Sequence, residues 1–190
     1  MAWKKLLCCV MICMILMGCG QEERSAQKAL DLRTSLLEAG GCRFTAVIGA
    51  DYGQRTYSFS VSCLYRTDGS AEISVLQPEE IAGITAVISD RGAQLQFEDL
   101  ELDFGKMADG NVSPMECCHL LASCWAEAYI ASSGKDGDLQ RITYLDGFED
   151  EELTVDTWID TKGNPVYGEV AYDGSRCLTV TISDFQWLSN

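Results

Sequence analysis

Histidine and positive charge are both scarce in this chain of 190 residues. It contains one histidine, and its 14 lysines and arginines are outnumbered by 29 aspartates and glutamates, which gives a formal net charge of −15 at pH 7. Nucleic-acid phosphates are bound mainly by lysine and arginine, and anionic lipid head groups attract clusters of the same residues. The composition therefore argues against nucleic acid as a partner and against charge-driven binding to anionic lipids.

Motifs of common catalytic and metal chemistry are also missing. The chain has no Gly-x-Ser-x-Gly elbow, no glycine-rich phosphate loop and no Cys-x₂-Cys pair. The one metal-like cluster is Cys117, Cys118, His119 and Cys124. On a helix, Cys117 and Cys124 are ~10 Å apart and Cys118 points ~100° away from Cys117, so one ion cannot take all four. We expect a core or surface histidine, no metal, no cofactor and no enzymatic activity.

Paired carboxylates can perform acid–base chemistry when one of them is desolvated. Asp156 and Asp160 flank Trp158. By alternation, however, both lie on the polar side of a predicted strand. The pattern therefore favours a solvated surface over a catalytic pair.

A hydrophobic run long enough to span a bilayer, which needs ~20 apolar residues, does not occur. Instead, Lys4 and Lys5 precede a short apolar stretch, Leu6 to Met17, and a small residue, Gly18. This arrangement is typical of a secretory signal peptide, which we place at residues 1–18.

The end of this segment, Leu16-Met17-Gly18-Cys19, resembles a bacterial lipobox. The resemblance implies that Cys19 is acylated, becomes the mature N-terminus and anchors the protein to the extracytoplasmic side of the cell membrane. An ordinary secretory cut beside an accidental cysteine is the alternative. We expect residues 19–24 to form the lipidated cysteine and a short tether.

Residues 25–190 have the length of one domain. Six cysteines remain there, and an exported chain permits disulfides, but sequence does not choose among fifteen pairings. Buried free thiols are the alternative, since several of these cysteines stand where a small apolar residue would serve.

Most of this domain alternates apolar and polar residues with a period of two, which predicts antiparallel strands. The run Tyr57 to Tyr65 is the clearest example. A one-residue phase jump between the runs 93–97 and 100–104 suggests a bulge or a corner. The predicted strands cover 42–50, 55–65, a strand around Ile73 and Val75 that ends at Pro78, 84–89, 93–97, 100–104, 139–145, 153–159, 166–172 and 177–183.

Two segments have helical periodicity instead. Residues 21–39 form the first predicted helix, which ends at Gly40 and Gly41. The second spans 114–132, where Ser113, Pro114 and Glu116 resemble a capping box, and a loop is expected over 134–138. The acidic run 149–152 is expected to be a solvated turn.

These elements predict an α+β fold in which a large antiparallel sheet curls, with the N-terminal helix and the mid-chain helix covering its concave face. The side chains that we expect on that face could bind a ligand or partner, and for each of them a plain core position is the alternative. They are Tyr57, Phe59, Val61, Leu95, Phe97, Val155 and Ile159.

The chain resembles the LolA/LppX-like lipoprotein-carrier superfamily in Phe44-Thr45-Ala46-Val47, in the strand pairs up to Phe104 and in the strand–turn–strand segment from Leu153 to Val170. The resemblance implies an unclosed β-barrel with helices over an apolar concavity. Members bind acyl chains or lipoproteins, or dock proteins. The segment from Pro78 to Ile84 is similar to germination lipoproteins of the GerS type, which implies a cortex-modifying amidase as partner.

The sequence thus favours a non-enzymatic, membrane-anchored binding protein. The first hypothesis is docking of a protein partner, in particular a cell-wall or spore-cortex hydrolase in germination. The alternative is a carrier that holds acyl chains or lipoproteins in its apolar concavity. A hydrolase is disfavoured by the missing catalytic constellation.

Overall fold

The computed structural model describes residues 19–89, 92–105, 107–108, 111–147 and 152–189. The predicted signal peptide, Asp90 and Arg91 in one predicted turn, and most of the acidic turn at 149–152 lie outside the described residues.

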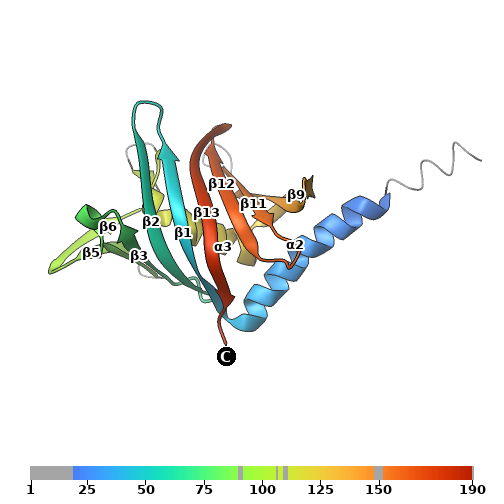
Figure 1. Ribbon diagram of the computed structural model, residues 1–190, viewed down its shortest axis with the longest axis horizontal. Coiled ribbons are helices and arrows are strands. Elements are labelled where there is room, and N and C mark those ends of the chain that lie inside the picture. The colour runs from blue at the N-terminus through green and yellow to red at the C-terminus, as the bar shows by residue number, and fades with distance from the viewer. Residues whose placement is uncertain (1–18, 90–91, 106, 109–110, 148–151, 190) are drawn as a thin grey trace, which may run out of the picture.

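Eleven strands form one antiparallel sheet in the order β6-β5-β4-β3-β2-β1-β13-β12-β11-β10-β9 (Figure 1). Strands β6 and β9 are its two edges, so the sheet curls without closing. The strands are β1 (Gly41–Asp51), β2 (Thr56–Arg66), β3 (Ala71–Gln77), β4 (Thr85–Ser89), β5 (Gly92–Phe97), β6 (Leu100–Phe104), β9 (Tyr129–Asp136), β10 (Leu139–Asp146), β11 (Leu153–Ile159), β12 (Pro165–Tyr172) and β13 (Ser175–Trp187). A separate short hairpin pairs β7 (Met107–Ala108) with β8 (Asn111–Val112).

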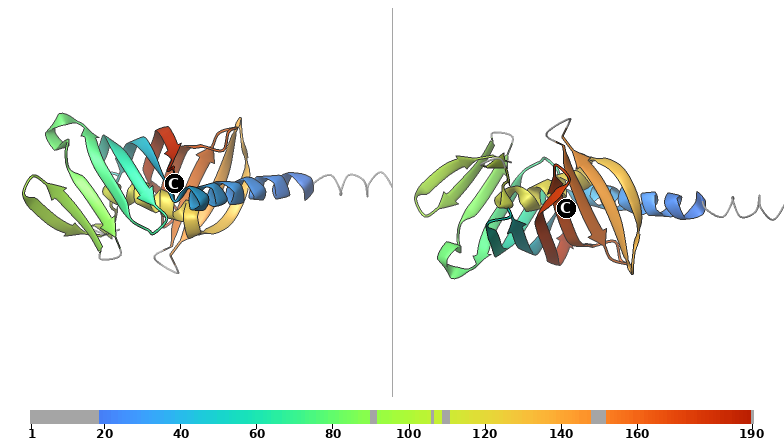
Figure 2. Two further views of the ribbon diagram at one scale, coloured as in Figure 1. Left: turned by 90° about the horizontal axis from the view of Figure 1, so that it is seen from below. Right: turned by 90° about the horizontal axis from the view of Figure 1, so that it is seen from above.

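Helix α3 (Cys117–Glu127) lies inside the curl, with strands on both sides of it (Figure 2). Trp125 of this helix is fully buried, and its Nε1 donates a 2.8 Å hydrogen bond to Thr157 Oγ1 of β11. Gly168 of β12 permits the close approach, because a Cβ there would lie 2.3 Å from Leu121 Cδ2. The core therefore consists of α3, one side of α2 and the inward side chains of β1–β4 and β10–β13.

Helix α2 (Cys19–Ala39) packs through its second half, where Ala29, Leu32 and Leu36 are buried, and its first half extends beyond the sheet (Figure 1). Gly41 then turns the chain into β1 with φ 144°, and a Cβ there would lie 2.1 Å from the carbonyl oxygen of Tyr65. Only glycine fits this junction. The helix was expected to begin at residue 21; it already begins at Cys19.

The prediction of a helix over 114–132 is wrong at both ends. A 3₁₀ turn, η2 (Pro114–Glu116), precedes α3, and the helix stops at Glu127. Residues 129–136 instead form the edge strand β9, paired with β10 from Leu145 to Leu139, so the expected loop at 134–138 is reduced to the turn between these two strands. Pairing with β10 satisfies the backbone of Ile130, Ser132 and Ser133, which have modest helix propensity, and tertiary pairing thus overrides the helical period.

The capping box predicted for Ser113 and Glu116 is not formed in the structure. Ser113 is the N-cap of η2 and Pro114 is its first residue, but the Ser113 side chain makes no cap hydrogen bond. Glu116 faces His119 instead, with its Oε2 3.2 Å from the ring Nδ1.

The phase jump between the runs 93–97 and 100–104 reflects a hairpin and not a bulge or corner. Phe97 pairs with Leu100 across a two-residue turn whose first residue, Glu98, has φ 51°. Because paired residues share a face, the apolar side chains of β5 and β6 stay together despite the jump.

The predicted α+β architecture, with an unclosed curled antiparallel sheet, an N-terminal helix and a mid-chain helix, is confirmed. Within the described part of the chain, neither helix combines the length and the apolar content needed to cross a bilayer.

Candidate binding groove

The concave side is incompletely covered where β2 begins, and a groove of about 740 Å³ opens there. Its walls are formed by β2, β3, the segment between β3 and β4, β5 and the chain just before α3. Its apolar lining consists of Tyr57, Phe59, Val75, Ile81, Ile84, Leu95, Val112, Pro114 and Met115. This volume falls within the range of ~300–1,000 Å³ typical of small-molecule sites.

Polar groups gather at the end of the groove formed by the β1–β2 turn. Arg55 is exposed and is the one charged residue among those that line the groove, and Gln54 lies beside it. Tyr52 donates a 2.6 Å hydrogen bond from its hydroxyl to the Val112 carbonyl oxygen, which ties this turn to β8. Burial raises the pKa of Tyr52 to about 12. The groove lining thus combines apolar side chains with one cation, which belongs to the β1–β2 turn.

The apolar surface continues past the groove onto the β5–β6 hairpin. Leu95 pairs with Leu102, and Phe97 pairs with Leu100, so all four share one face of the hairpin. Leu100 and Leu102 are 72% and 66% exposed, and Phe97 is 38% exposed. An apolar strip therefore runs from the groove to the free edge of the sheet.

The seven side chains expected on the concave face fall into two groups. Tyr57, Phe59 and Leu95 line the groove, and Phe97 lies beyond it on the same face of β5. In contrast, Val61, Val155 and Ile159 are at most 1% exposed and pack in the core. Strand alternation predicts only that these side chains point to the concave face. How far the helices extend over that face decides which of them are buried in the core.

Other groove residues were not anticipated. Ile81 and Ile84 belong to the segment after Pro78, where η1 (Glu79–Ile81) and a turn bring both side chains back over β3. Met115 and Arg55 fall within the ranges of a predicted helix and a predicted strand, and the sequence does not mark either as a groove residue. Ile81 and Ile84, on either side of Gly83, could have been predicted to be covered or to line a site, because exposed turns seldom contain two isoleucines.

His119 links two parts of the fold through its ring nitrogens. Its Nε2 lies 3.2 Å from the Gly69 carbonyl oxygen, and its Nδ1 lies the same distance from Glu116 Oε2. The ring therefore bridges α3 to the β2–β3 turn. Among the described residues, no group of three histidine, cysteine or acidic side chains could hold a metal ion.

The cysteines of the domain form no disulfide in this structure, and all except the half-buried Cys177 are buried. Burial raises the pKa of the Cys42 thiol to about 12 and raises those of Cys63 and Cys117 well above the usual value. These thiols are therefore protonated and unreactive in the folded protein at neutral pH.

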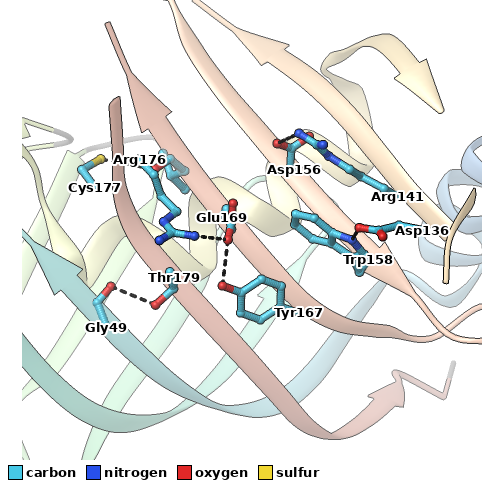
Figure 3. A network of polar contacts seen from close by, with 11 residues as sticks. Gly49, Asp136, Arg141, Asp156, Trp158, Tyr167, Glu169, Arg176, Cys177 and Thr179 are labelled. Atoms are coloured by element: carbon cyan, nitrogen blue, oxygen red, sulfur yellow. Dashed lines mark hydrogen bonds and ion pairs between the residues drawn. The ribbon is translucent and has the colours of Figure 1, made fainter. Parts of the chain in front are cut away.

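A polar network covers the opposite, outer face of β9–β13 (Figure 3). Arg141 lies over the Trp158 ring at 5.2 Å and pairs with Asp156 at 2.5 Å, and Trp158 Nε1 donates to Asp136 at 2.8 Å. A second group on the same face links Glu169 to the Tyr167 hydroxyl and to Arg176. The network joins neighbouring strands and lies apart from the groove.

The expectation that Asp156 is solvated is wrong. Its side chain is buried, and it accepts hydrogen bonds from Thr143 Oγ1 and from Arg141, whose guanidinium also lies over the Trp158 ring. The hydrogen bond from Arg141 also raises the pKa of that guanidinium. Asp160 is separate: its Oδ1 accepts from the backbone amides of Lys162 and Asn164 and stabilises the β11–β12 turn. The two carboxylates thus have unrelated structural roles.

Neither family models nor curated proteins match this chain. Solved structures give weak likenesses. An outer-membrane lipoprotein-sorting protein domain from Vibrio parahaemolyticus has a TM-score of 0.46 at 8% identity, covering 87% of this chain and 93% of that one. Lipoprotein LppX from Mycobacterium tuberculosis has a TM-score of 0.44 at 14% identity, with coverages of 88% and 96%. An uncharacterized conserved protein from Thermus thermophilus has a TM-score of 0.47 at 8% identity, with coverages of 87% and 89%. Likeness at this level carries no conclusion about what this chain binds.

Proposed function

We propose that this protein is a non-enzymatic binding protein, exported and anchored through an acylated Cys19, whose groove takes an acyl chain with a polar or anionic head. The observation that carries the proposal is the groove itself, with its nine apolar side chains and a single cation, Arg55, at one end.

The chemistry of the groove matches such a ligand. Each methylene of a ligand that is transferred from water to an apolar site contributes ~0.8 kcal/mol to binding. The apolar walls of the groove can bury the methylenes of an acyl chain in this way. Arg55 offers a guanidinium to a carboxylate or phosphate in a molecule that is otherwise strongly acidic. An acyl chain with an anionic head uses both features.

Titration with a fluorescent sixteen-carbon fatty acid tests this proposal. Leu95→Asp places a charge on the groove wall and should weaken binding at least ~10-fold, because the charge must be desolvated or the chain displaced. Leu37→Asp is the matched control, since Leu37 is 51% exposed on α2 and does not line the groove. Equal affinity of the two variants, or no binding by the wild-type protein, contradicts the proposal.

Arg55 can be tested in the same titration. Arg55→Ala should weaken binding of the fatty acid several-fold and reduce its salt dependence, because a charge pair is lost. Arg43→Ala removes another exposed cation, on β1, which does not line the groove, and should change neither quantity.

A second candidate function is protein docking, with a cell-wall or spore-cortex amidase in germination as the expected partner. The free edge of β6 favours it, because an exposed edge strand beside Leu100 and Leu102 can pair with a strand of another protein. The groove and the strip could also serve one apolar segment of such a partner together.

A further inference from the structure

Strand β6 is the free edge of the sheet at its apolar end (Figure 1). Strand β5 pairs with it on one side, and on the other side no strand of the described chain does so. Such an edge presents a row of unpaired backbone N–H and C=O groups, and its residues from Leu100 to Asp103 are all exposed. We propose that β6 binds an extended segment of a partner protein in which one basic residue stands between two apolar residues. The proposal rests on the docking function proposed above and specifies the chemistry of the partner's segment.

The apolar residues of the segment follow from the faces of β6. Side chains alternate between the two faces of a strand, so Leu100 and Leu102 share a face, and Leu102 lies beside Leu95 of the groove wall. A strand added to β6 continues this face. Apolar residues opposite Leu100 and Leu102 would cover side chains that are now 72% and 66% exposed. The added segment therefore favours apolar residues at two alternate positions.

The basic residue follows from the side chain between these two leucines. Glu101 is exposed on the other face of β6, and the partner residue between the two apolar ones lies directly opposite it. Asp103 shares that face, but its Oδ1 accepts a 3.0 Å hydrogen bond from Gln94 Nε2, which directs this carboxylate toward β5. The sequence from Gly92 to Gly105 contains no lysine or arginine. A cation opposite Glu101 thus has to come from the partner, where opposite charges stabilise and like charges destabilise the pairing.

A second copy of this chain is the nearest alternative occupant, and the register of such a pair argues against it. If two β6 strands paired antiparallel with their apolar faces continuous, Glu101 would lie opposite Asp99, Glu101 or Asp103 of the other copy. Each of these registers places two carboxylates side by side. The charge on β6 therefore selects a different chain over a copy of itself.

Fluorescence anisotropy with two dye-labelled peptides tests this selection. One peptide is Gly-Val-Thr-Val-Lys-Val-Thr-Val-Gly, and the other has glutamate in place of the lysine. The chain from Gly20 to Asn190, which contains every described residue but Cys19, should bind the lysine peptide at least ~5-fold more tightly, because an attractive cross-strand pair replaces a repulsive one. High salt should narrow the difference, since it screens exposed charges.

A charge reversal makes the outcome specific to β6. Glu101→Lys should reverse the preference, so that the glutamate peptide binds more tightly than the lysine peptide. A misfolded variant cannot produce this gain of binding. Glu72→Lys is the matched control, because Glu72 is an exposed acid on the same face but on the internal strand β3, and it should keep the wild-type preference.

Three results would overturn the proposal: no binding of either peptide, equal affinity for both, or a Glu101→Lys variant that still prefers the lysine peptide. The peptides also separate this inference from the docking function. An amidase that binds through β6, while the peptides show no preference, would contradict the inference and leave the docking function in place. A preference for the lysine peptide without amidase binding would support the inference and contradict the amidase as the partner.

Discussion

Leu95 and Leu102 lie side by side on paired strands, one lining the groove and the other two-thirds exposed at the free edge of the sheet. The pair joins two features that would otherwise be unrelated, the apolar groove and the exposed hairpin. Monomeric soluble proteins rarely leave large continuous apolar surfaces in water, and those that remain often mark interaction sites. We therefore expect binding at this end of the sheet.

Docking of a partner strand on β6 predicts an asymmetry between the two faces of that strand. Leu102→Lys, on the apolar face, should weaken binding of a purified cell-wall amidase from the same host at least ~10-fold, because a charge enters the contact. Asp103→Lys changes the charge on the opposite face and should have a small effect. Surface plasmon resonance can compare the two; equal effects, or no binding by the wild-type chain, contradict the docking function.

The packing of α2 depends on Arg33, whose guanidinium donates to three carbonyl oxygens at the end of α3. The distances are 3.0 Å to Trp125, 3.4 Å to Cys124 and 2.6 Å to Ala128. Arg33→Ala should lower the free energy of unfolding by about 2–3 kcal/mol, because these part-buried carbonyls lose a charged donor.

Urea unfolding measures this loss. Lys28→Ala is the matched control, because Lys28 is an exposed cation on the same helix. Arg33→Lys should restore only part of the stability, since a lysine cannot reproduce the fork of donors. A loss for Arg33→Ala no larger than that for Lys28→Ala would show that the contact contributes nothing.

Alkaline pH should destabilise the reduced protein. Burial raises the pKa of Cys42 from 9.0 to about 12, so between these values the unfolded chain loses the proton that the folded chain keeps. The stability is therefore fully present below pH 9 and declines as the pH rises toward 12, by about 4 kcal/mol for this one group. Cys63 and Cys117 change stability in the same direction.

Urea midpoints between pH 8 and pH 11 (roughly the range over which an unfolded thiol ionises) can follow this decline. Cys42→Ala removes one titrating group and should flatten the slope, whatever it does to stability at neutral pH. An unchanged slope in the variant would mean that Cys42 does not resist ionisation in the folded state.

The strands could be predicted from sequence where alternation is clear, as in Tyr57 to Tyr65. Strand β9 could not, because Tyr129 to Ser133 lacks a period of two and continues the apolar spacing of the helix before it. Its pairing with β10, together with the hydrogen bonds from Arg33 to the end of α3, defines the boundary. Arg33 and the end of α3 are more than 90 residues apart in the sequence, and local patterns do not report such a contact.

The site was predictable only in part for a similar reason. Phe59 and Val61 are successive inward residues of one strand, yet Phe59 lines the groove and Val61 is fully buried. Alternation assigns a side chain to a face, but the extent of the covering helix decides whether that face is core or groove. The length of α3 was overestimated, so this division was not visible from the sequence.

Native mass spectrometry of the chain from Gly20 to Asn190, produced in its own host and purified without detergent, tests the central claim most directly. The account predicts a species heavier than the polypeptide, whose added mass is extracted by organic solvent and is lost in Leu95→Asp but kept in Leu37→Asp. A polypeptide mass alone, together with no uptake of an added sixteen-carbon fatty acid, would contradict an acyl-binding groove.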